Sequence, residues 1–199
     1  MMDTRLRRRL APSLEWSAEH LARRGVSATA LTLTGLVLAL VAAGLAAAAA
    51  WNAALVLWLV SRLPDGLDGP VARVSGGGTA LGGWSDISAD LAAYGAFIAG
   101  CGIGNPDARV ACLVLLTTYY VNGGSLLALS AARSDRGLEP ADGRTFHFSR
   151  GLAEGTETIV VHAAMVLLPA AMAGIAWGFA AVVLATILQR IATAVRLLR

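Results

Sequence analysis

The chain has 199 residues, of which 56% are hydrophobic and 15% charged, and its mean hydropathy is +0.64. Because an ordinary soluble domain carries about a quarter charged residues, this composition argues against a soluble helical bundle. The chain has no lysine, and its net charge of +3 reflects arginines that gather at the ends of apolar segments. A membrane surface explains this charge better than nucleic acid does, and no nucleic-acid partner is expected.

The first 27 residues are polar and charged, without the short apolar core of a cleavable signal peptide. Leucines recur at helical spacing along this stretch, and arginine and glutamate side chains lie opposite them. The pattern predicts an amphipathic helix that lies in the plane of an anionic leaflet. A flexible cytoplasmic tail is the alternative interpretation.

Six apolar segments follow, and each approaches the roughly 20 residues that cross a bilayer as a helix. The expected spans are residues 28–50, 52–74, 79–102, 108–132, 149–169 and 171–197. We therefore predict an all-α, polytopic membrane protein with six transmembrane helices and an N-terminal amphipathic interfacial helix. Residues 1–199 are expected to form one membrane domain, with the interfacial helix and lead-in over 1–27 and a six-helix bundle over 28–199.

The arginines also predict the orientation of the spans. With six spans, both termini and the loops after the second and fourth spans lie on one side, and that side collects nearly all arginines of the loops and termini. The opposite loops carry only Arg109. By the positive-inside rule the arginine-rich side is cytoplasmic, and we expect an integral protein of a bacterial inner membrane.

Four aspartates interrupt the second and third spans near their cytoplasmic ends. Asp65 and Asp68 are three residues apart, and Asp86 and Asp90 are four apart, so each pair shares one helix face. The glycine-rich turn at residues 76–78 makes the two spans antiparallel neighbours, which brings the pairs together. A charged group at the centre of a membrane costs roughly 2.5–3.5 kcal/mol on insertion scales, and such groups are usually functional.

Converging carboxylates repel one another, and hard divalent cations that prefer oxygen ligands relieve this repulsion. We therefore predict that Asp65, Asp68, Asp86 and Asp90 bind Mg²⁺ or Mn²⁺. Two such ions would clamp a phosphate or pyrophosphate and stabilise a displacement at phosphorus. Small residues in the same segment, among them Gly66 and Gly83, either admit a ligand or serve helix packing.

The segment from Asp65 to Asp90 reads D-x2-D-G-x2-A-R-x8-G-x3-D-x3-D. It resembles the signature of the CDP-alcohol phosphatidyltransferase family of integral membrane enzymes. The resemblance implies transfer of a substituted phosphate (phosphatidyl) group from a CDP-linked donor, usually CDP-diacylglycerol, to the hydroxyl of an alcohol. CMP is released, the reaction belongs to phospholipid biosynthesis, and members of the family commonly form homodimers.

The resemblance also implies roles for individual residues. Asp65, Asp68 and Asp86 would bind two divalent ions, and Asp90 would complete the cluster and act as the general base on the acceptor hydroxyl. The nucleotide site would be lined by Gly69, Ala72, Arg73 and Gly82. Thr32 in the first span is a further candidate for a nucleotide contact.

The acceptor alcohol is left open by the resemblance, because Ile87 and Leu91 match neither the glycerophosphate-using nor the inositol-phosphate-using members. The sequence is most similar to a bacterial branch of unknown acceptor that carries a stretch like RGLAEGTETI. We expect Arg150, Glu154 and Glu157 of this stretch to surround the acceptor. Hydrogen bonding between helices is the alternative role for these side chains, and it is the role expected for a buried His162.

Two other functions are compatible with acidic groups inside a membrane. A small cation transporter would use the carboxylates as an ion relay, but it requires polar groups that continue toward the opposite side, and the second and third spans are free of charge beyond the motif region. A lipid-binding scaffold without catalysis would be expected to lack one of the aspartates.

Overall fold

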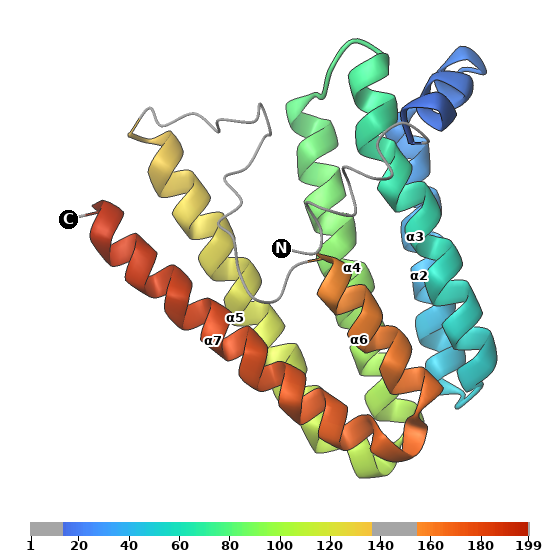
Figure 1. Cartoon of the computed structure of the whole chain (residues 1–199), viewed down its shortest axis with the longest axis vertical. Coiled ribbons are helices and arrows are strands. Elements are labelled where there is room, and N and C mark those ends of the chain that lie inside the picture. The colour runs from blue at the N-terminus through green and yellow to red at the C-terminus, as the bar shows by residue number, and fades with distance from the viewer. Residues whose placement is uncertain (1–13, 137–154, 199) are drawn as a thin grey trace.

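The computed structural model describes residues 14–136 and 155–198, and all regular secondary structure within these ranges is helical (Figure 1). Residues 14–23 form a helix at the start. The elements that follow are α2 (Ala28–Ala47), α3 (Trp51–Val74), α4 (Ala80–Gly104), η1 (Pro106–Ala108), α5 (Arg109–Ser134), α6 (Gly155–Leu167), η2 (Pro169–Ala171) and α7 (Met172–Leu198). The predicted Arg150 and Glu154 and the first half of the expected interfacial helix lie outside the described residues.

Helices α2 to α7 coincide with the six predicted segments. Four helical stretches of the described chain are long and apolar enough to cross a membrane, namely Ala28–Ala47, Ala80–Gly104, Pro106–Ser134 and Pro169–Leu198. The described part of α6 has only 13 residues, and α3 carries the charged residues of the motif. The apolar helices make this an integral membrane protein, and the crossing of the bilayer by α3 and α6 remains a prediction.

Local chemistry explains where the helices near the motif begin and turn. The Ser27 hydroxyl accepts a hydrogen bond from the Ala30 amide (3.2 Å) and caps α2, and the Thr79 hydroxyl accepts one from the Gly82 amide (3.0 Å) and caps α4. Between α3 and α4, Gly76 and Gly77 have φ values of 108° and 103°. Only glycine adopts such values without strain, so the predicted turn is specified by these two residues.

The bundle is organised around α2, which packs against both α3 and α4 (Figure 1). α3 and α4 make far less backbone contact with each other than each makes with α2. A Cβ atom on Gly100 or Gly104 of α4 would overlap the carbonyl oxygen of Ala43 or Ala46. Glycine is therefore required where α4 crosses α2, and the gap between α3 and α4 is spanned by side chains instead of backbone contact.

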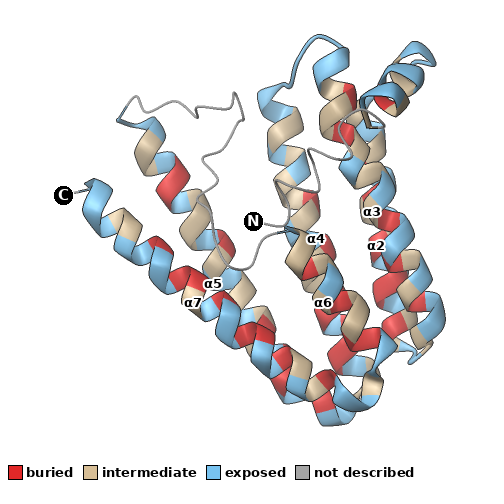
Figure 2. Ribbon diagram, viewed as in Figure 1, coloured by how far each residue is buried: buried red, intermediate tan, exposed pale blue. Residues whose placement is uncertain are grey.

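Figure 2 shows that the buried residues follow the facing sides of the helices, whereas exposed residues cover the outer sides. Large apolar side chains stand on those outer sides, for example Leu33, Val37, Val110 and Leu184, as contact with lipid requires. Inside the bundle, the Trp58 ring stacks on Phe97 with centroids 4.3 Å apart and lies 4.9 Å from the His162 ring. This aromatic centre joins α3, α4 and α6 directly below the acidic residues of the motif.

Candidate metal and substrate site

Three of the predicted aspartates come together between α3 and α4. One carboxylate oxygen from each of Asp65, Asp86 and Asp90 lies within 4.8 Å of the others. Ligand oxygens around a Mg²⁺, Mn²⁺ or Ca²⁺ ion stand roughly 2.0–2.6 Å from it, so oxygens this close to one another can share a single ion. The donor set therefore fits the divalent cation that the sequence predicts.

The fourth aspartate is turned toward α2. Asp68 is 7% exposed, and its Oδ2 atom accepts a 2.7 Å hydrogen bond from the Thr32 hydroxyl while Oδ1 accepts a 2.6 Å bond from the Gly69 amide. Convergence of all four carboxylates was predicted, and the structure places three together with Asp68 beside them. The reason is the Thr32 hydroxyl on α2, which binds one carboxylate oxygen of Asp68 while the Gly69 amide binds the other.

A cation that the sequence analysis missed lies against the same cluster, so the expectation that the second span is free of charge beyond the motif is wrong. The Nη1 atom of Arg62 is 3.4 Å from Oδ1 of Asp90 and 3.6 Å from Oδ1 of Asp65, and the Arg62 side chain is 8% exposed. Its Nε atom donates to the Ser61 hydroxyl at 3.1 Å. The signal was available in the sequence, because Arg62 precedes Asp65 by three residues and thus shares its helix face.

The predicted nucleotide residues continue from the cluster toward the α3–α4 turn. Gly69, Ala72 and Arg73 follow the aspartates along α3, and Gly82 lies in the first turn of α4. A Cβ atom on Gly66 would meet nothing within 4 Å, and one on Gly69 would meet only the Arg73 guanidinium, at 3.5 Å. These glycines border open space instead of a packed helix, so room for a ligand explains them better than helix packing does.

A close helix contact occurs nearby, at a glycine that the sequence analysis did not single out. A Cβ atom on Gly35 of α2 would lie 3.1 Å from the Ser61 carbonyl oxygen and 3.5 Å from the Asp65 amide nitrogen. This contact sets how closely α3 approaches α2 at the turn that carries Arg62 and Asp65. The absence of a side chain at position 35 thus helps to position the cluster.

The start of α6 lies near the turn of α4 that follows Asp90. A Cβ atom on Gly155 would lie 4.0 Å from the Tyr94 hydroxyl, and Tyr94 follows Asp90 by one helical turn. Glu157 in the first turn of α6 has a buried Oε2 atom without a hydrogen-bond partner among the described residues. An unpaired buried carboxylate oxygen is costly, and it is the feature expected of a group that binds a ligand.

His162 is buried as expected of a core histidine, but its hydrogen bonding is incomplete, because its buried Nδ1 atom has no partner among the described residues. It is fully buried, and its Nε2 atom lies 2.9 Å from the Tyr119 hydroxyl. The rings of Trp58, Tyr94 and Phe97 surround it, so it belongs to the aromatic centre below the acidic cluster.

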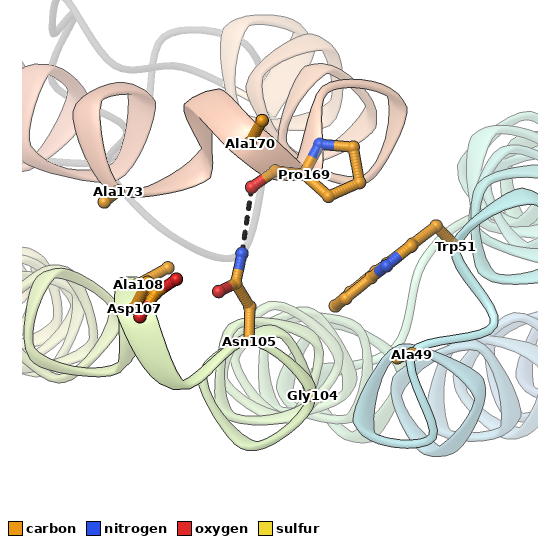
Figure 3. A pocket seen from close by; sticks show the side chains of 9 residues that line it. All are labelled: Ala49, Trp51, Gly104, Asn105, Asp107, Ala108, Pro169, Ala170 and Ala173. Carbon is orange, nitrogen blue, oxygen red and sulfur yellow. Dashed lines mark hydrogen bonds between the residues drawn. The ribbon is translucent and has the colours of Figure 1, made fainter.

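A separate cavity of about 320 Å³ lies at the opposite end of the helices (Figure 3). It is bordered by the α2–α3 turn, the end of α4 and η2, and Asn105 bridges it by donating to the Pro169 carbonyl at 2.9 Å. Asp107 is the one acidic residue in its lining. This cavity offers no group of carboxylates and is remote from the motif.

Comparison with known proteins agrees with the site. Residues 26–195 match the sequence profile of the CDP-alcohol phosphatidyltransferases, so the chain belongs to the CDP-alcohol phosphatidyltransferase family, which is a family of enzymes. It is 34% identical over 173 residues to the inner membrane protein YnjF of Escherichia coli strain K12, covering 85% of this chain and 84% of YnjF.

The fold is also that of solved structures of phosphatidylinositol phosphate synthase (PgsA1) from Mycobacterium tuberculosis. With CDP-DAG bound, that enzyme is 23% identical with a TM-score of 0.74, covering 91% of this chain and 92% of that one. Its complex with manganese and citrate gives 24% identity and a TM-score of 0.73, covering 91% and 88%. The profile match over residues 26–195 confirms the family that the aspartate motif suggests.

Proposed function

We propose that this chain transfers a phosphatidyl group from CDP-diacylglycerol to the hydroxyl of an alcohol and releases CMP. The observation that carries the proposal is the convergence of the Asp65, Asp86 and Asp90 carboxylates beside open space at Gly66 and Gly69. The binding of CDP-DAG by a synthase of the same fold supports the choice of donor. A cation transporter is disfavoured by the family and by α3 and α4, where the described residues beyond Arg62 and Asp90 include no charged side chain.

Asp65, Asp68 and Asp86 would hold two Mg²⁺ or Mn²⁺ ions, with Asp90 completing the set, and Asp68 joins by rotating its carboxylate away from Thr32. Bound divalent ions neutralise charge on the pyrophosphate and on the leaving CMP. Gly69, Ala72, Arg73 and Gly82 would line the cytidine and phosphate groups. The manganese complex of the synthase with this fold supports a divalent ion as the cofactor.

Asp90 would accept the proton of the acceptor hydroxyl as the oxygen forms a bond to the lipid-linked phosphorus. The bond between this phosphorus and CMP breaks, and CMP leaves with the electron pair. Asp90 suits the role because it is the one of the two clustered aspartates on α4 that lies farther from the α3–α4 turn, and it is one helical turn from Tyr94, where α6 approaches. Glu157, with Arg150 and Glu154 ahead of it in the chain, would contact the acceptor.

The site would open to the cytoplasm of a bacterium from a bundle of six spans, with the helix around residues 14–23 on the leaflet surface and a second copy of the chain as partner in a homodimer. A cytoplasmic opening suits release of the water-soluble CMP, and it follows from the arginine distribution.

The test is CMP release by the purified protein with Mn²⁺, CDP-diacylglycerol and a panel of alcohols. Asp90→Asn should lower kcat by about 10²–10⁴-fold, the usual contribution of a general base. Asp107→Asn, which changes an acidic residue at the opposite end of the bundle, should retain wild-type turnover. Turnover that survives Asp90→Asn, or metal uptake into liposomes without a CDP-linked donor, would contradict the proposal.

A further inference from the structure

Arg62 is a buried charge that the reaction as described does not use. Its side chain is 8% exposed, and it lies in the middle of α3, where the chain from Trp51 to Ser61 carries no other charged side chain. A charged group at membrane depth is expensive and is retained where it has a function. The nearest groups of opposite charge are Asp65 and Asp90 of the candidate metal site.

The contacts of Arg62 place it on the inner side of the cluster. It precedes Asp65 by one turn in α3, and Tyr94 follows Asp90 by one turn in α4, so both lie deeper in the bundle than the aspartates. The nucleotide residues Gly69 and Arg73 lie on the other side, toward the α3–α4 turn. The carboxylates therefore lie between Arg62 and the region where the donor phosphates are expected.

Its guanidinium group is also held rigidly. It lies 4.6 Å from the centroid of the Trp58 ring and 5.5 Å from that of Tyr94, which are cation–π distances. The Ser61 hydroxyl accepts from Nε, and Trp58 is itself fixed by stacking on Phe97. A planar guanidinium packed in this way presents its Nη1 atom to the aspartates in one defined direction.

We propose that Arg62 is a positioning residue that holds the Asp90 and Asp65 carboxylates from the side away from the α3–α4 turn. This proposal rests on the function proposed above. The contact between Nη1 and Oδ1 of Asp90 fixes the orientation of this carboxylate and leaves its other oxygen for the acceptor hydroxyl. The same positive charge, next to two ligands of the divalent ions, weakens the binding of those ions. Arg62 thus improves the geometry for turnover and lowers metal affinity.

This pair of effects makes a distinctive prediction for Arg62→Met. Methionine is flexible and apolar and retains packing on the Trp58 and Tyr94 rings. Loss of the Arg62 charge should tighten Mn²⁺ binding by roughly tenfold. A full positive charge in contact with two of the ion's ligands changes the free energy of ion binding by more than a kilocalorie per mole. Loss of the Asp90 contact should at the same time lower kcat by roughly 10–100-fold, as misplaced catalytic groups do.

The experiment measures Mn²⁺ binding to the purified protein by calorimetry or by loss of the free-ion EPR signal, without any substrate. In parallel, kcat and KM for CDP-diacylglycerol are measured from CMP release. Arg62→Lys keeps the charge but not the planar geometry, so it should bind Mn²⁺ like the wild type and still show reduced kcat. Arg24→Met removes an exposed arginine outside the bundle and should match the wild type in both measurements.

Tighter Mn²⁺ binding together with lower kcat in Arg62→Met would support the role. Weaker or unchanged Mn²⁺ binding would overturn it, and so would a raised KM for the donor with unchanged kcat, which is the signature of a phosphate contact. If Arg62→Met fails to fold, a wild-type kcat in Arg62→Lys overturns the proposal. A wild-type protein that releases no CMP would count against the proposed function, whereas the Mn²⁺ measurement still decides on the charge of Arg62.

Discussion

Individual side chains of the motif have partners that spacing along one helix does not reveal. The grouping of Asp65, Asp86 and Asp90 follows from the i, i+3 and i, i+4 spacing and the glycine turn, and it was predicted. The direction of the Asp68 carboxylate depends on Thr32, which is 36 residues away in sequence on another helix. Nothing in the pattern of α3 specifies that neighbour, so Thr32 was expected only as a nucleotide contact.

The bond between Thr32 and Asp68 leads to a prediction about stability. Thr32→Val leaves a buried carboxylate without its side-chain donor, and a lost hydrogen bond to a charged group costs about 1.5–3 kcal/mol. We expect a lower thermal unfolding temperature of the metal-free protein in detergent. Saturating Mn²⁺ should reduce the difference from wild type, because Asp68 then has the ion as a partner.

Thr34→Val is the matched control for this measurement. Thr34 is exposed on the same helix, and its hydroxyl bonds only to the carbonyl of Ala30 within α2. The free energy of unfolding of Thr34→Val should equal that of wild type within about 0.5 kcal/mol, as for most surface substitutions, so the unfolding temperature should be nearly unchanged. Equal destabilisation by both variants, with and without Mn²⁺, would remove the special role of the Thr32–Asp68 pair.

At the scale of helices, the apolar segments were predicted from hydropathy because length and composition alone decide whether a helix can cross a bilayer. Which helices touch could not be predicted in the same way. The glycine turn suggested that α3 packs directly on α4, whereas α2 packs on both. Close contacts therefore occur at Gly35, Gly100 and Gly104, whereas Gly66 and Gly69 of the motif segment border open space.

Gly35 provides a test of how helix packing positions the site. In Gly35→Ala the new methyl group would lie 3.1 Å from the Ser61 carbonyl oxygen, so α3 must move by a few tenths of an ångström at Arg62 and Asp65. Because small displacements of catalytic groups are costly, we expect kcat to fall roughly tenfold with little change in expression. Gly44→Ala, on the same helix with open space around it, should keep wild-type kcat, and equal losses in both variants would contradict the argument.

At the scale of the whole molecule, the turns of the described chain gather at two ends of the bundle (Figure 1). One end carries the α3–α4 turn beside the helix of residues 14–23, and the other carries the α2–α3 turn, η1 and η2. The Asn105–Pro169 hydrogen bond ties η1 and η2 together at this second end. The arginine-rich side predicted from sequence corresponds to the first end. Because α3 carries charged residues, its hydropathy does not decide whether it crosses the membrane, and labelling of the two ends measures the orientation directly.

Single cysteines can measure this orientation, because both native thiols, Cys101 and Cys112, are buried. Ser75→Cys and Asp107→Cys place exposed thiols at the two ends of α4, and Ala170→Cys places one in η2. With a membrane-impermeant maleimide, Ser75→Cys should react from the cytoplasmic side only, in inside-out vesicles. Asp107→Cys and Ala170→Cys should react only in right-side-out vesicles, since η1 and η2 share one end.

The unsubstituted chain should remain unlabelled in both vesicle types, which confirms that the native thiols are protected. Reaction of Ser75→Cys from the outer side would place the carboxylate cluster away from the cytoplasm and contradict the proposed cytoplasmic opening of the site. Labelling of Ser75→Cys and Asp107→Cys from the same side would mean that α4 does not cross the bilayer. In that case Asp86 and Asp90 would no longer lie at the membrane depth that makes their charge costly, and that cost would no longer indicate a functional site.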